Sequence, residues 1–93
     1  MKKFSELVKG DHVYFISTEK MCPAYGNVEE ETIRTKRKKK NRLEIMTVED
    51  NYYFVEMKDI EESTIKIEGD YFIVYMSTNK EDLEQIKKDY EIC

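Results

Sequence analysis

One short segment near the start of the chain, from Lys9 to Ile16, limits the possible folds more than any other. Gly10 and Asp11 are a turn signal, and the aromatic and β-branched run that follows has the length of a single strand. Because side chains alternate along a strand, both faces of this one carry apolar groups. We therefore expect a first strand from about Asp11 to Thr18, central or bent within a small barrel.

The segments on either side extend this scheme. Phe4, Leu7 and Val8 have the spacing of one helical turn, which we expect to cover one end of the barrel. A long second strand is expected to open at 25–28. In a regular strand Val28 and Ile33 would point to opposite faces of the sheet. A β-bulge among the three glutamates 29–31, or a bend, is therefore needed to direct both side chains into the core.

The clearest hairpin joins the second strand to the third. A three-residue loop, Lys39–Asn41, with Asn41 in the left-handed conformation, pairs Lys38 with Arg42, Lys36 with Glu44 and Thr35 with Ile45. In that register the core face carries Ile33, Thr35, Leu43 and Ile45, and the solvent face carries Arg34, Lys36, Lys38, Arg42 and Glu44.

Three more strands and one helix complete the predicted fold. After a turn at 49–51, strands are expected at 52–57, with Tyr53, Val55 and Met57 opposite Thr47, Ile45 and Leu43, and then at 64–68 and 71–76. Ile60 is tucked inward between them. Thr78 and Glu81 fit a capping box that begins a helix over about 79–90, which would cover the sheet face of 71–76. The predicted fold class is mainly β (α+β): a small antiparallel barrel of five to six strands, about 10–77, with a C-terminal helix, all in one domain.

A resemblance rests on two short patterns, Gly10-Asp11-His12-Val13 and Tyr25-Gly26-Asn27-Val28. They are similar to the G-D-x-V and G-x-V pattern of SH3-like small barrels of the KOW and Tudor-like kind, over about the first third of the chain. The resemblance implies a strongly bent antiparallel sheet and a module that binds nucleic acid, peptides or proteins. It carries over no functional residue, because the basic insertion and the C-terminal extension depart from KOW modules.

Composition narrows the class of protein. Charged residues make up 39% of the 93 residues, well above the usual share of about 25%, and seven Tyr and four Phe supply bulky groups for a thin core. Cys22 and Cys93 lie far apart, so their pairing stays open and no metal-ligand spacing exists. No apolar run approaches a membrane span or a signal segment, and we expect a reduced, cytoplasmic protein.

One charge feature suggests a function. Residues 34–42 hold seven of the sixteen basic residues, and removing these seven charges from the net charge of −4 leaves −11 on the other 84 residues. Such a tip suits an acidic partner because each phosphate that it neutralises releases counterions. It equally fits a solvated hairpin end that keeps sheet edges apart. The candidate binding residues are Arg34, Lys36, Arg37, Lys38, Lys39, Lys40 and Arg42.

The other candidates have simpler structural explanations. His12, the only histidine, is expected to make a local hydrogen bond, and Cys22 has no partner base except His12. Acidic groups at 29–31, 49–50 and 61–62 are expected to be solvated surface rather than a cation site. An aromatic platform is an open alternative to core packing for Tyr14, Tyr25, Tyr52, Tyr53 and Phe54, although no aromatic residue interrupts the basic run itself.

Two function hypotheses from different classes follow. The first is a non-enzymatic binding module, without cofactor, that docks the basic hairpin on a nucleic acid or a nucleic-acid complex. The second is a small inhibitor encoded by a bacterial mobile element or phage against a defence nuclease, an anti-CRISPR-like protein acting by protein–protein contact. The oligomeric state stays open under both.

Overall fold

The computed structural model describes residues 2–20 and 26–89 of the chain. The segment predicted around Cys22 and Tyr25, and the end of the chain with Cys93, lie outside them. In order, the elements are η1 (Phe4–Glu6), β1 (His12–Glu19), β2 (Glu29–Lys38), β3 (Arg42–Thr47), β4 (Tyr52–Glu56), η2 (Met57–Asp59), β5 (Thr64–Glu68), β6 (Phe72–Ser77) and α1 (Lys80–Asp89). All the predicted strands are present, with ends shifted by a few residues.

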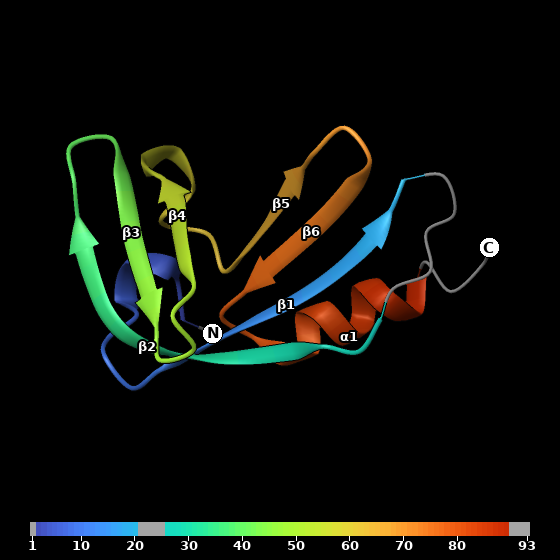
Figure 1. Ribbon diagram of the computed structural model, residues 1–93, viewed down its shortest axis with the longest axis horizontal. Helices are drawn as coiled ribbons and strands as arrows, with labels where there is room; N and C mark the ends of the chain where they lie inside the picture. The colour runs from blue at the N-terminus through green and yellow to red at the C-terminus, as the bar shows by residue number, and fades with distance from the viewer. Residues whose placement is uncertain (1, 21–25, 90–93) are drawn as a thin grey trace.

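The strands form one antiparallel sheet in the order β4-β3-β2-β1-β6-β5. The long strand β2 pairs with β1 through its first half and with β3 through its second half. It bends strongly between the two, so that the sheet curls and its edge strands β4 and β5 face each other across an open side (Figure 1). The result is a mainly β half-barrel that is compatible with an SH3-like fold.

The core fills the inside of this curl. Its centre includes Val13 and Phe15 from β1, and the turn η1 contributes Phe4, which is fully buried. Ile60, predicted to point inward, packs against the same cluster. The buried members of the core are Phe4, Leu7, Val13, Phe15, Ile33, Leu43, Ile45, Val55 and Met76.

The second apolar face of β1 is covered by the helix. Ile16 has the opposite parity to Val13 and Phe15 and is nevertheless buried, as is Leu83 of α1. Helix α1 contacts β1 and β6 and lies beneath them in Figure 1. The expectation that both faces of the first strand carry apolar groups is confirmed. The helix was expected over 71–76, and it contacts β1 as well as β6.

The β-bulge lies elsewhere than predicted. Glu29, Glu30 and Glu31 pair regularly with β1, and the register shift falls between Ile33 and Thr35. This is the point at which β2 leaves β1 and begins to pair with β3, and a bulge supplies the local bend that such a corner needs. The extra residue reverses which face of the sheet each later residue of β2 points to. Thr35 is therefore exposed, and Lys36 lies opposite Ile45 on the inner face.

The hairpin loop is also shorter than predicted. Lys38 pairs with Leu43, and the Lys39 amide donates to the Arg42 carbonyl at 2.8 Å, which leaves Lys40 and Asn41 as the loop. Among the described non-glycine residues only Asp50 has a positive φ, of 64°, so Asn41 is not left-handed. The left-handed residue expected at Asn41 is found instead at the end of the β3–β4 loop, where an aspartate tolerates that backbone.

Two smaller predictions are corrected as well. Tyr53 lies opposite Ile45, and Val55 opposite Leu43, a shift of two positions from the predicted register that keeps the same side chains on the inner face. Met57 belongs to η2 rather than to the strand. The side chain of Asn79, not of Thr78, caps α1, since its Oδ1 accepts from the Glu81 amide at 3.3 Å.

Candidate functional site

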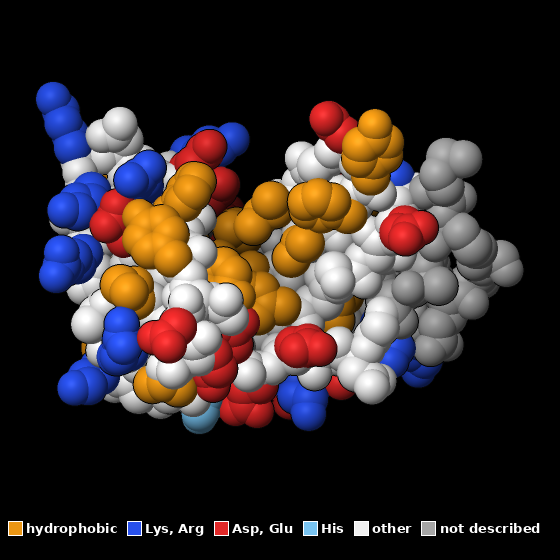
Figure 2. Space-filling view, in the orientation of Figure 1, with side chains coloured by type: hydrophobic (Ala, Val, Ile, Leu, Met, Phe, Trp, Pro, Cys, Tyr) orange, Lys and Arg blue, Asp and Glu red, His pale blue; other side chains and the backbone are white. Residues whose placement is uncertain are grey.

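The basic residues gather at one end of the molecule, on the β2–β3 hairpin. This hairpin forms the far end of the half-barrel in Figure 1, and Lys and Arg side chains cluster over it in Figure 2. The register divides them between two faces. Arg37 and Lys39 share the outer face with Arg42, whereas Lys36 and Lys38 lie on the inner side.

Three of the seven predicted residues, Arg34, Arg42 and Lys36, are occupied by contacts within the protein. Arg34 forms an ion pair with Asp50 at 3.4 Å, and Arg42 forms one with Glu44 at 2.9 Å. The described residues contain no ion pair for the other four basic side chains of the tip: Arg37, Lys38, Lys39 and Lys40. These four, which we call the open cations, carry the unneutralised charge of the hairpin.

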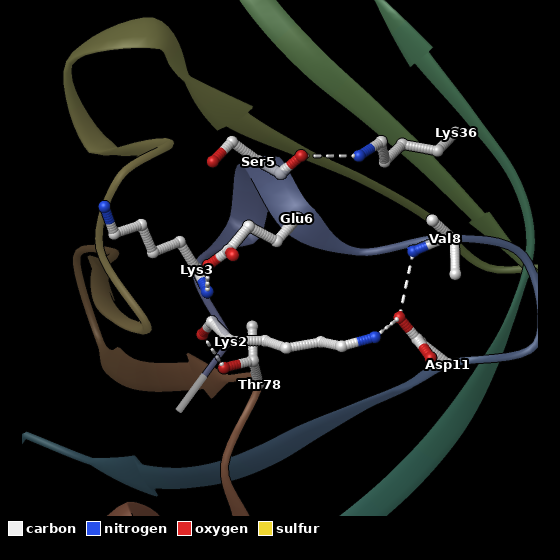
Figure 3. A network of polar contacts seen from close by, with 8 residues as sticks. All are labelled: Lys2, Lys3, Ser5, Glu6, Val8, Asp11, Lys36 and Thr78. Atoms are coloured by element: carbon white, nitrogen blue, oxygen red, sulfur yellow. Dashed lines mark hydrogen bonds and ion pairs between the residues drawn. The ribbon is translucent and has the colours of Figure 1, made fainter.

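Lys36 has a structural role in addition to its charge. Its Nζ donates to the Ser5 carbonyl at 2.9 Å, and burial lowers its pKa (Figure 3). Close by, Asp11 accepts from the Lys2 ammonium at 2.6 Å and from the Val8 amide at 2.9 Å, and these bonds lower its pKa. This polar network ties the start of the chain to β2, so Lys36 is turned away from an external partner.

Two aromatic side chains lie on the outer face beside the open cations. Phe54 is directly opposite Glu44, which is opposite Arg37 on the next strand, so the three form one row across the sheet. Tyr52, two residues before Phe54, points to the same side. They are 47% and 49% exposed, with ring centroids 6.5 Å apart.

Glu44 and Arg42 fix the geometry of this face. The Tyr52 hydroxyl bonds Glu44 and lowers its pKa, and Arg42 acts in the same direction. The guanidinium of Arg42 lies over the Phe54 ring, 5.1 Å from its centroid. Arg42 is therefore held between the Glu44 carboxylate and the Phe54 ring.

The surface is hollowed beside these groups. One shallow depression, of about 540 Å³, is bordered by Arg42, Phe54 and Lys58 among others, and a second, of about 550 Å³, is bordered by Lys39, Lys40 and Arg42. A third hollow of about 380 Å³ lies at the open side between β4 and β5, where Tyr53, Ile65 and Ile67 line it. Hydrophobic side chains gather in that hollow in Figure 2.

The remaining aromatic and acidic candidates are placed apart from this face. Tyr14 lies near His12, and His12 Nδ1 is 3.1 Å from both the Thr32 hydroxyl and the Glu30 carboxylate, which is the local bonding expected of it. The described residues include no group of three or more acidic, His or Cys side chains arranged to hold a metal ion. No helix among them is long and apolar enough to cross a membrane.

The side chain of Glu31 makes three hydrogen bonds, to three different segments of the chain. Its carboxylate accepts from the Tyr53 hydroxyl at 2.5 Å, from the Thr47 hydroxyl at 2.7 Å and from the Asn51 amide at 2.8 Å. Burial alone would raise the pKa of Glu31, but these three bonds outweigh it and lower the pKa. Burial and the nearby carboxylate raise the pKa of Tyr53. The cluster links β2 to the β3–β4 loop and to β4, so its role is structural.

Sequence reasoning found the open cations but missed their aromatic neighbours as part of the same site. Tyr52 and Phe54 were among five candidates for a platform, and only the register of β4 against β3 shows that these two share a face with Arg42. Comparison with known proteins adds no assignment: no protein-family model, curated protein or solved structure matches this chain.

Proposed function

We propose that this protein is a non-enzymatic binding module that docks the β2–β3 hairpin on an acidic macromolecule, most simply a nucleic acid. The observation that carries the proposal is the group of four open cations, Arg37, Lys38, Lys39 and Lys40, at one end of a chain whose other residues are strongly acidic. The finer assignment to SH3-like barrels of the KOW or Tudor-like kind is part of the same proposal.

Electrostatics supports this function over a merely solvated tip. Neighbouring like charges repel, and opposite charges on the adjoining strand would relieve that repulsion. Here the acids nearest the hairpin pair with Arg34 and Arg42 and leave the cations closest to the loop unpaired. A polyanion that neutralised them would release its own counterions, which is the main source of affinity in sequence-independent binding.

The test compares two charge-matched double variants. K39Q/K40Q removes two open cations, and K80Q/K88Q removes two exposed lysines of α1 at a distance from the hairpin. At 50 mM salt we expect K39Q/K40Q to weaken binding of a labelled oligonucleotide by about tenfold or more, and K80Q/K88Q to change it little. Fluorescence anisotropy measures both.

Two outcomes would overturn the proposal. Wild-type protein that binds neither single-stranded nor duplex oligonucleotides at 50 mM salt has no nucleic-acid function. Equal weakening by the two double variants would mean that overall charge, not the hairpin, sets the affinity. The first result would leave the inhibitor hypothesis, with a protein as the acidic partner, as the one to pursue.

A further inference from the structure

The aromatic pair on the outer face of β4 is not explained by packing. Tyr52 and Phe54 are each about half exposed, and neither belongs to the buried core. Their inner-face neighbour Tyr53, by contrast, packs against Phe15 with ring centroids 4.5 Å apart. The outer pair therefore forms a surface of its own, next to the basic hairpin.

From this juxtaposition we infer that the outer face of β2, β3 and β4 binds single-stranded nucleic acid, with bases stacked on Phe54 and Tyr52 and phosphates held by Arg37 and Lys39. The inference rests on the proposed function and deepens it. It names the strand state of the nucleic acid and the side chains that distinguish it.

The spacing of the rings favours a single strand. Their centroids are 6.5 Å apart, which is about twice the roughly 3.4 Å rise per nucleotide of a duplex strand. Successive bases can reach that separation only when they are unstacked from each other, as they are in an extended single strand. A duplex keeps its bases inside the helix and would leave both rings without a partner.

The charges around the rings suit phosphates. The two depressions that meet at Arg42 are bordered by Lys39 and Lys40, so open cations lie beside the rings where a backbone would run. Glu56 also borders one of them, and it is paired with Lys58 at 3.6 Å. The guanidinium of Arg42 already lies over the Phe54 ring, 5.1 Å from its centroid, so a base on that side of the ring would stack on the guanidinium. Glu44 does not oppose a phosphate strongly, because Arg42 and the Tyr52 hydroxyl already engage its carboxylate. An acidic protein surface would use the cations but has no bases to stack on the rings.

The experiment measures the affinity of wild type and variants for two probes, a labelled 12-nucleotide oligothymidine and a duplex with the same number of phosphates. F54L keeps an apolar side chain but removes the ring. F72L is the control, because Phe72 on β6 is also half exposed, at 50%, and lies two strands away from β2. We expect F54L to weaken single-strand binding about 5- to 150-fold, the range for loss of one base–aromatic stack, with duplex binding unchanged.

The outcomes separate this inference from the proposed function. If F54L and F72L bind the single strand equally, or if the duplex binds more tightly than the single strand, the inference is wrong. In that case, weaker binding of both probes by K39Q/K40Q would still support the hairpin as the binding element.

Discussion

The carboxylate of Glu31 offers the sharpest test of how the half-barrel is held at its corner. Replacing it with glutamine keeps the size of the side chain and removes its charge. An amide oxygen in the place of Oε1 can still accept from the Thr47 hydroxyl and the Asn51 amide, but as part of a neutral group. The amide NH2 in the place of Oε2 cannot accept from the Tyr53 hydroxyl, so that bond is lost. Hydrogen bonds to charged groups contribute about 1.5–3 kcal/mol, against about 0.5–1.5 kcal/mol for neutral ones.

The expected cost follows from that difference. Two bonds that each lose about 1 kcal/mol and a third that is lost altogether would sum to about 3 kcal/mol or more, but Glu31 is only half buried and solvent screens part of the loss. We therefore expect Glu31→Gln to lower the free energy of unfolding at pH 7 by about 1–2 kcal/mol. Urea denaturation followed by circular dichroism measures this, with Glu84→Gln, an exposed change on α1, as the control.

The difference in stability between wild type and Glu31→Gln should depend on pH. The folded-state pKa of Glu31 lies below its ordinary value of 4.5, so its stabilising contribution is fully present above about pH 4.5 and is lost as the pH falls through the folded-state pKa. The gap between wild type and Glu31→Gln should then shrink in acid. A variant as stable as wild type at pH 7, or a gap that persists unchanged at pH 3, would refute the reasoning.

Three further predictions concern the core, the helix cap and the inner face of the hairpin. Ile45→Ala removes a fully buried side chain and should lower the free energy of unfolding by about 2–5 kcal/mol in urea denaturation. Asn79→Ala removes the cap of α1 and should cost about 1 kcal/mol in the same measurement, with the exposed Glu84→Gln on the same helix as the comparison. Lys36→Met should leave oligonucleotide affinity within about threefold of wild type, because Lys36 bonds the Ser5 carbonyl; a loss as large as that of K39Q/K40Q would show that Lys36 belongs to the binding surface.

Sequence alone predicted the strands because each carries its own signal. The run His12–Ile16 and the alternation over 64–68 mark strands by side-chain type, and Lys87 and Lys88 lie in the last turn of α1 as a helix end requires. These signals are local, so they do not depend on how distant segments of the chain pair.

The register of the basic hairpin could not be predicted in the same way. Residues 34–42 include no large apolar side chain, so nothing in that run marks which positions face the core. The position of the bulge, between Ile33 and Thr35, was therefore not predicted, and neither was the inward orientation of Lys36. The contact of Arg34 with Asp50 depends on that register and on the β3–β4 loop. The contact of Arg42 with Phe54 depends on how β3 pairs with β4.

The salt dependence of binding tests the central claim most directly, that the open cations of the hairpin hold a polyanion. Four phosphate contacts on a single strand predict a slope of about −3 in a plot of log affinity against log salt, or a loss of about 50-fold between 50 and 200 mM. K39Q/K40Q should halve the slope and reduce that loss to about 7-fold, whereas K80Q/K88Q should leave it unchanged. An affinity that does not change with salt, or a slope that is the same in all three proteins, would contradict the account.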